Sequence, residues 1–148
     1  MDYTSTDPNA PVVFTYTVPG VYQARITVTD SQTNVFTQDV LVSVQDGAQM
    51  DQMFTTLLGG MNTALISGDV TKAGSYLNTA AKLKYLPVFQ TLLPQMPQII
   101  ASYSPLHRIS IFGEIGEYAI NRTIGGTNNI FLIYFLRDSD GVWRLDAM

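Results

Sequence analysis

Apolar and polar residues alternate with a period of two over the first 46 positions of the chain. Residues 12–18, 22–29 and 35–44 are rich in β-branched and aromatic side chains, and a Pro-Gly pair and a polar turn separate them. Successive side chains of a strand point to opposite faces of a sheet, so this period gathers the apolar residues on one face. The pattern predicts three antiparallel strands with a single apolar face.

After Asp46 the period changes to that of amphipathic helices. Apolar residues recur three and four positions apart from Met50 to Leu65, and similar spacing continues as far as Leu93. A Ser-Gly pair ends the first of these segments, and Asp69 is a good N-cap for the next. The pattern predicts helices at residues 48–66, 69–81, 85–93 and 98–103.

Strand periodicity returns near Arg108. The expected strands are residues 108–112, 118–124, 130–136 and 142–147. The Gly-Gly pair at 125–126 and the Asp-Gly pair at 140–141 are typical of tight hairpin turns. Residues 130–136 are apolar at every position, as in an interior strand that helices cover on one face and a partner covers on the other. Helices followed by an antiparallel sheet predict an α+β fold, with domains at residues 1–46 and 47–148.

Composition and charge exclude several classes of function. The chain is 46% hydrophobic and 14% charged, as expected of a folded protein. Residues 1–46 carry one cation and five anions, whereas residues 47–148 carry seven of each. Without a basic stripe, binding to nucleic acid is not expected. The apolar runs are too short to cross a bilayer, so membrane insertion is not expected either.

The residue types that usually hold metals or attack substrates are scarce. The chain has no cysteine and a single histidine, His107, which excludes thiol catalysis and histidine clusters. Residues 138–141 begin like a calcium loop but lack its further ligands, so a hairpin turn is the preferred interpretation. We therefore predict no catalytic residue, no metal site and no cofactor.

The first 46 residues carry a family resemblance. Tyr16, Gly20 and Tyr22, in the spacing Tyr-x-x-x-Gly-x-Tyr, are followed by Ile-Thr-Val-Thr-Asp at residues 26–30. Residues 12–44 thus resemble the final strands of a PKD-type, immunoglobulin-like domain. Such domains are spacers or adhesion modules outside the cell, so the resemblance implies a secreted or surface-exposed bacterial protein. Residues 1–46 are either a truncated domain or a reduced module.

The remaining residues carry a second resemblance. Its motifs are Met-Asn-Thr-Ala-Leu-Ile-Ser-Gly-Asp-Val at 61–70, Tyr-Leu-Pro-Val-Phe at 85–89 and the closing segment at 138–145. Residues 48–148 resemble the nuclear-transport-factor-two-like superfamily, in the form appended to large bacterial surface proteins. The resemblance implies a cone-shaped (cystatin-like) domain, with N-terminal helices packed on a curved, four-stranded antiparallel sheet. Members of this superfamily include isomerases, dehydratases and plain association domains.

A cone of this kind offers a pocket between helices and sheet, and we name Tyr134, Arg122, Tyr118 and Tyr85 as candidate ligand-binding residues. An isomerase mechanism needs a general base and a donor for the oxyanion. Tyr134 could be the donor, but no carboxylate stands out as its partner. Further polar candidates, which structural roles explain more simply, are Tyr76, Tyr103, His107, Glu114, Glu117 and Arg144.

The leading hypothesis is a non-enzymatic association or binding module at the C-terminus of a larger protein, with the PKD-like part as spacer. Its partner would be a second copy or another surface protein. The alternative is a pocket for a small apolar ligand, of isomerase or lyase type. A cavity filled by Phe131, Phe135 and Trp143 would count against that alternative. A third hypothesis is that residues 12–44 pair with a second copy by strand exchange.

Overall fold

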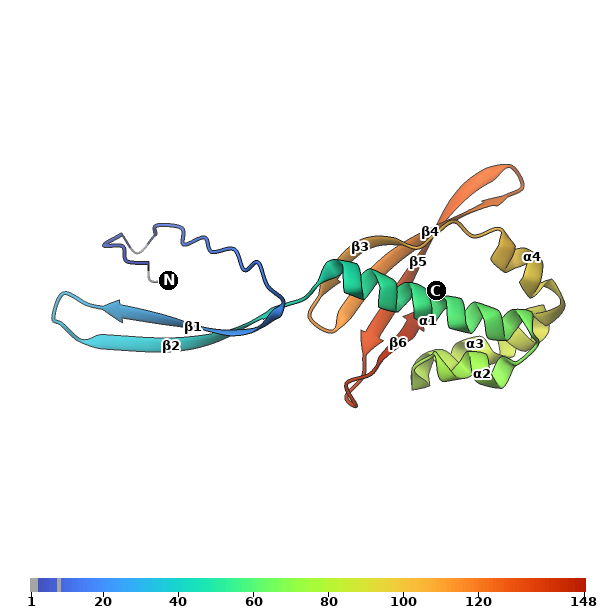
Figure 1. Cartoon of the computed structure of the whole chain (residues 1–148), viewed down its shortest axis with the longest axis horizontal. Coiled ribbons are helices and arrows are strands. Elements are labelled where there is room, and N and C mark those ends of the chain that lie inside the picture. Colours follow the sequence, from blue (N-terminus) through green and yellow to red (C-terminus); the bar gives the residue numbers. More distant parts are fainter. Residues whose placement is uncertain (1–2, 8) are drawn as a thin grey trace. The chain divides into compact units, whose positions relative to one another are not determined.

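The computed structural model describes residues 3–7 and 9–148, and it divides the chain into two compact units (Figure 1). The first, which we call the β unit, is Met1–Asp46, and the second, the α+β unit, is Gly47–Met148. The division falls where the period of the sequence changes from two to that of a helix.

The β unit contains a two-stranded antiparallel sheet. Strands β1 (Gly20–Thr29) and β2 (Val35–Val44) pair along their whole length. The carboxylate of Asp30 closes the turn between them by accepting hydrogen bonds from the backbone N–H groups of Gln32 and Asn34, at 2.8 and 2.9 Å. Such side-chain-to-backbone bonds are typical of aspartate in turns.

The prediction of a third strand at residues 12–18 is wrong. Within the described residues the segment has no regular secondary structure and forms no ladder with another strand. The ring of Tyr16 packs instead on that of Tyr22, with ring centroids 4.4 Å apart, and the Tyr22 hydroxyl donates to the carbonyl of Val18. High β propensity yields a strand only where a partner completes its hydrogen bonds. The apolar face of β1 and β2 stays exposed at Ile26, Val28 and Phe36.

Helices come first in the α+β unit: α1 (Gly47–Ile66), α2 (Val70–Ser75), α3 (Thr79–Leu92), the 3-10 turn η1 (Leu93–Gln95) and α4 (Met96–Ala101). The second helix ends six residues earlier than its spacing predicts. Leu77 leaves the helix to form a parallel bridge with Leu145, and the Asn78 side chain caps α3. The apolar spacing is compatible with one helix or two, and the contact with Leu145 selects two.

The sheet of the α+β unit is an antiparallel meander. Its strands are β3 (His107–Phe112), β4 (Ile115–Ile124), β5 (Thr127–Arg137) and β6 (Trp143–Ala147), in spatial order β3-β4-β5-β6. The two glycines between β4 and β5 have φ of 58° and 83°, which allows a two-residue turn. The predicted α+β architecture, helices packed against a four-stranded antiparallel sheet, is confirmed.

Aromatic rings fill one end of the space between helices and sheet. Phe54 of α1 stacks on Phe135 with centroids 4.3 Å apart, and it forms T-shaped pairs with Tyr118 and Trp143, with centroids 5.2 and 5.0 Å apart. Gly116 makes room for this ring, because a Cβ there would lie 2.7 Å from it. We call these four side chains the aromatic cluster. They lie on the inner face of the sheet, the face that the helices cover.

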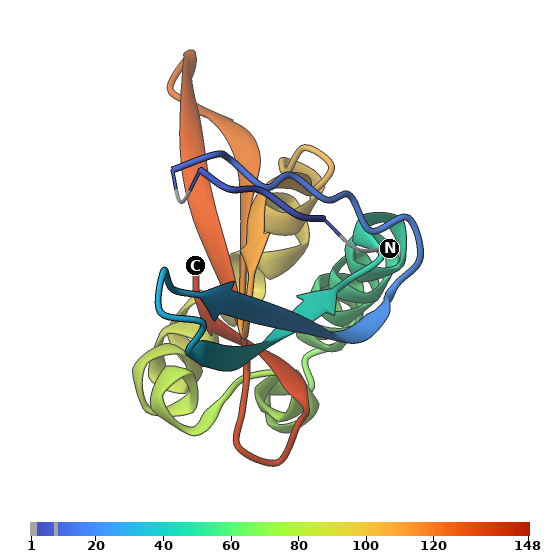
Figure 2. The same cartoon turned by 90° about the vertical axis from the view of Figure 1, so that its left-hand side faces the viewer.

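The opposite face of the sheet, which we call the outer face, carries apolar side chains that remain exposed. Phe112 is 86% exposed and Ile130 is 68% exposed, and the views in Figures 1 and 2 show the β4–β5 hairpin reaching beyond the other strands. The register places these residues on the outer face: Phe112, Ile115, Glu117, Ala119, Ile130, Leu132, Tyr134 and Leu136. In the apolar run at 130–136, Ile133 and Phe135 of the inner face are buried, whereas Ile130, Phe131 and Leu132 are exposed. The expectation that both faces of this run are covered is therefore wrong for its first half.

Two adjacent glycines of α1 are expected to respond oppositely to alanine. A Cβ at Gly59 would meet no atom within 4 Å, whereas one at Gly60 would lie 2.5 Å from the hydroxyl oxygen of Tyr76. Since alanine favours a helix by about 1 kcal/mol over glycine, Gly59→Ala should raise the free energy of unfolding by about that amount. Gly60→Ala should lower it, because the tyrosine ring must move. Urea denaturation measures both, and equal effects would contradict the packing of Tyr76 on α1.

Candidate functional site

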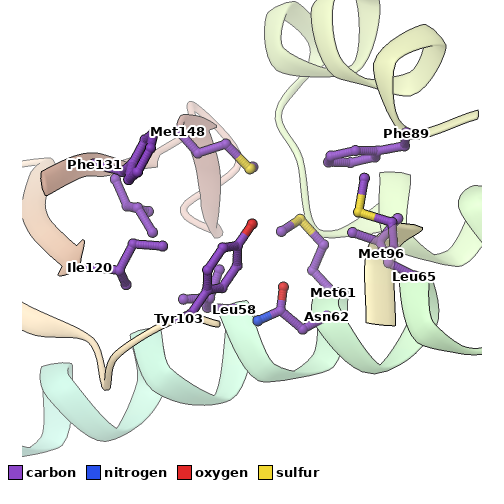
Figure 3. Close-up of a pocket in the computed structure, with 11 residues that line it drawn as sticks. Leu58, Met61, Asn62, Leu65, Phe89, Met96, Tyr103, Ile120, Phe131 and Met148 are labelled. Carbon is purple, nitrogen blue, oxygen red and sulfur yellow. The ribbon is translucent and has the colours of Figure 1, made fainter. Parts of the chain in front are cut away.

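A cavity of about 80 Å³ lies between α1, α3, α4 and the inner face of the sheet, and we call it the inner cavity (Figure 3). It lies apart from the aromatic cluster, of which none of the four side chains lines it. Its walls are mostly apolar, and two polar side chains, Asn62 and Tyr103, also line it. The space holds more than one water molecule, since a single water needs roughly 10–15 Å³.

The two polar groups of the inner cavity have no hydrogen-bond partner among the described residues. Figure 3 shows the Tyr103 hydroxyl pointing toward the space between Met61 and Met148. Burial raises the pKa of Tyr103, and the nearby positive charge of Arg122 opposes that rise. The tyrosine therefore stays protonated at neutral pH and offers a neutral donor at the cavity wall.

Arg122 lies near Tyr103, at the hairpin end of the inner face. Its Nε is buried and has no hydrogen-bond partner in the described part of the chain. Leaving a buried donor unpaired costs about 1–3 kcal/mol. Arg122 is thus the one sequence-predicted site residue whose polar group is both buried and available.

Tyr118 is buried on the inner face, but its hydroxyl is already engaged. It donates to Asp51 of α1 at 2.7 Å, and Arg108 of β3 lies 3.6 Å from the same carboxylate. Burial first, and then the hydrogen bond to Asp51, raise the pKa of Tyr118 far above its ordinary value. The group is held protonated and links α1 to the sheet, which is a structural role.

Tyr85 of α3 is engaged at the end of β6. Its hydroxyl donates to the carbonyl of Met148 at 2.8 Å and accepts from the N–H of the same residue at 2.9 Å. Both hydrogen-bonding functions of the hydroxyl are used, so Tyr85 joins a helix to the sheet rather than facing a ligand.

Tyr134 lies on the outer face, where its hydroxyl donates to Glu117 at 2.9 Å. This bond is the main cause that raises the pKa of Tyr134, with burial second. Tyr134 and Arg122 do not converge, because they occupy opposite faces of the sheet. The carboxylate partner of Tyr134, which the sequence analysis did not identify, is Glu117. The Gly-Gly turn at 125–126 carries this information, because in a hairpin with a two-residue turn at these positions residue 117 pairs with residue 134.

The carboxylates of the turn at residues 138–141 are paired with an arginine of the same chain, Arg144. Arg144 contacts Asp138 at 2.7 Å and Asp140 at 2.8 Å, and its hydrogen bond is the main cause that lowers the pKa of Asp140 to about 2. In the described residues no group of three histidine, cysteine, aspartate or glutamate side chains could hold a metal. The loop is a hairpin turn closed by an ion pair.

The other polar candidates are scattered over the α+β unit. Glu114 lies 3.8 Å from Arg137 at the β3–β4 turn, His107 is exposed at the start of β3, and Tyr76 packs against Gly60. The structure therefore does not gather the predicted site residues. It brings Tyr103 and Asn62 to the wall of the inner cavity and places Arg122 near Tyr103. Asn62 was not named as a candidate from the sequence.

Comparisons with protein-family models, with curated proteins and with solved structures find no match to this chain. The resemblances to the PKD-type and nuclear-transport-factor-two-like families stay predictions. Among the described residues, no helix is both long and apolar enough to span a membrane.

Proposed function

We propose that the α+β unit is a non-enzymatic association module, which joins two copies of the chain through the outer face. The observation that carries this proposal is the apolar, exposed surface of the sheet, on which Phe112, Ile115, Ile130 and Leu132 are all more than a third exposed. Exposed apolar side chains gathered on one face of a sheet are a mark of interaction sites in folded proteins.

A second copy suits this surface because the outer face is complementary to itself. Its apolar side chains extend over β3, β4 and β5, and its polar residues Asn121, Thr123 and Asn128 lie at the hairpin end. The negative charge near its centre, on Glu117, is already bonded to the Tyr134 hydroxyl. In a two-fold dimer the same patch meets its own copy, so apolar residues cover apolar residues. A stable dimer needs about 600–1,000 Å² from each copy, and an open sheet face offers a surface of that kind.

The state of the polar groups supports a non-enzymatic function. Catalysis by a tyrosine needs a hydroxyl that can reach a substrate and a general base to act with it. The hydroxyls of Tyr85, Tyr118 and Tyr134 are each bonded within the chain. The Tyr103 hydroxyl is unpaired, but no carboxylate or histidine of the described residues lines the inner cavity beside it. From the sequence resemblance to surface-protein modules, we further propose that the chain belongs to a secreted or surface-exposed bacterial protein. Residues 1–46 would then be a spacer.

The inner cavity supports a second candidate function, the binding of a small apolar molecule. Its apolar walls and the unpaired hydroxyl of Tyr103 favour a ligand with an apolar body and one polar group. An isomerase or lyase reaction would also need a general base, and none lines the cavity in the described residues.

Phe112→Asp is expected to convert the dimer to a monomer. The change puts a charge where the partner's apolar surface would cover it, which should raise the dissociation constant at least about 100-fold. Native mass spectrometry and sedimentation measure the oligomeric state. Leu83→Asp is the matched control, because Leu83 is 80% exposed on α3, away from the outer face, and should leave the dimer intact.

Two outcomes would reject the dimer. One is a wild-type chain that stays monomeric at about 100 µM, well above the dissociation constants of specific interfaces. The other is a Phe112→Asp variant that dimerises as well as the control. A monomer that carries a reproducible extra mass would favour the second candidate function instead, and the mass would give the class of ligand.

A further inference from the structure

Part of β5 has a strand neighbour on one side only. β4 pairs with β5 along its whole length, whereas β6 pairs with β5 only from Tyr134 to Arg137. Within the described residues, no strand lies against the other edge of residues 127–133. Figures 1 and 2 show this part of the β4–β5 hairpin reaching beyond the end of the sheet.

The register shows which backbone groups face that open edge. Residues that flank a two-residue turn exchange both backbone hydrogen bonds, and bonded pairs then alternate along the hairpin. Odd-numbered residues of β5 therefore bond to β4, as the bond from the Arg137 N–H to the Glu114 carbonyl illustrates. The N–H and C=O groups of Asn128, Ile130 and Leu132 point to the open edge.

The inner cavity lies beside the same edge. Phe131 and Ile133 of β5 line it, and so does Met148, which follows the last residue of β6 (Figure 3). A strand added along the open edge would place its residue opposite Phe131 on the inner face, because paired residues of neighbouring strands share a face. That side chain would point into the inner cavity, which has room for one aliphatic side chain.

We propose that the open edge of β5 binds an extended apolar peptide segment of another protein by strand addition. The peptide backbone would bond to Asn128, Ile130 and Leu132, and one leucine- or methionine-sized side chain would fill the inner cavity. Main-chain bonds supply affinity and a side-chain pocket supplies selectivity in this mode of recognition. The site uses the edge of the sheet rather than the outer face, so it does not depend on the proposed dimer.

A second copy of β5 suits this edge less well than an aliphatic peptide. In antiparallel pairing of two β5 edges, even-numbered residues bond to even-numbered ones, so an odd-numbered residue stands opposite Phe131. Within the open segment that residue is Thr127, Asn129, a second Phe131 or Ile133. Pairing through Ile133 would leave only residues 131–133 of each open edge opposite one another. Thr127 and Asn129 are polar and Phe131 is aromatic, whereas the cavity wall is apolar and the space is small.

The test uses the full chain and a capped seven-residue peptide in which threonine and leucine alternate. Titration calorimetry should show binding to the wild-type chain. The matched control peptide has the same side chains, with N-methyl groups on the residues that would donate to β5, and should bind at least about tenfold more weakly, since two or more hydrogen bonds are lost. A peptide with serine in place of the central leucine should also bind more weakly.

Ile130→Pro removes the central N–H of the open edge. That N–H makes no bond to β4, and proline is tolerated on an edge strand, so the variant should fold and lose peptide affinity about tenfold. Ile130→Ala keeps the N–H and should stay within about threefold of the wild type. The monomeric Phe112→Asp variant should bind the peptide normally, which separates this proposal from the dimer.

Three results would overturn the proposal. The first is no binding of the alternating peptide to the wild-type chain, and the second is equal binding of the N-methylated control. The third is an Ile130→Pro variant that folds, as judged by circular dichroism, and still binds the peptide. Loss of the dimer in Ile130→Pro but not in Ile130→Ala, without peptide binding in the wild type, would assign the edge to a second copy instead.

Discussion

Phe54→Ala is expected to lower the free energy of unfolding of the α+β unit by about 3–5 kcal/mol, the range for deleting a buried phenylalanine side chain. Phe54 is fully buried, and its ring contacts Phe135, Tyr118 and Trp143. The substitution removes apolar burial and three ring contacts together. It also leaves a void, because Gly116 beneath the ring has no side chain with which to fill it.

Trp143 gives a direct readout for this variant. It is the only tryptophan of the chain and its ring meets the Phe54 ring edge to face, so its fluorescence follows unfolding of this region. Urea titration should place Leu83→Ala within about 0.5 kcal/mol of the wild type, because Leu83 is exposed. A loss below about 1 kcal/mol for Phe54→Ala would show that α1 does not pack on the sheet as described.

Asn78→Ala is expected to cost about 2–4 kcal/mol. Asn78 is only 7% exposed, and its side chain makes two bonds: Oδ1 accepts from the N–H of Ala81, which caps α3, and Nδ2 donates to Asp146. Losing a helix cap costs about 1 kcal/mol, and losing a hydrogen bond to a charged group costs about 1.5–3 kcal/mol. The residue connects the start of α3 to the last strand.

Asp69→Ala is the matched control for Asn78→Ala. Asp69 caps α2 through a 2.8 Å bond from the N–H of Lys72, but it is exposed and its side chain has no second bond in the described residues. It should lose only the cap, about 1 kcal/mol. Thermal unfolding of both variants measures the difference, and equal losses would show that the bond between Asn78 and Asp146 contributes nothing to stability.

The elements of the α+β unit were predictable because their periodicity is strong. The apolar spacing of α1 and the strand-forming runs of β4 and β5, bounded by the Gly-Gly turn, each agree with the structure. The segment between α2 and α3 was not predictable, because Leu77 fits a helical face and only its bridge to Leu145 reveals the break. Residues 12–18 show the opposite error: their sequence favours a strand, but no neighbouring strand of the described residues pairs with them.

The candidate site was predictable only in part. The sequence analysis named Arg122 as a ligand-binding candidate and its neighbour Tyr103 as a lesser one. It did not name Asn62, which lines the inner cavity, as a candidate site residue. The inner cavity draws on helices and strands that are distant in the chain, so no local pattern indicates it. The face on which Tyr134 lies could not be read from a run that is apolar at every position, although the Gly-Gly turn fixes its register with Glu117.

The meander topology has a consequence for how the α+β unit folds. Every strand pairs with its neighbour in the chain, so the sheet can form hairpin by hairpin, on the microsecond scale typical of hairpins. The packing of α1 is different, since its Asp51 meets Tyr118 across a separation of 67 residues. Closing such a loop carries an entropy cost before any contact repays it. Docking of the first helix on an already paired sheet is therefore the expected slow step of folding, and the helix that is synthesised first is the last to reach its place.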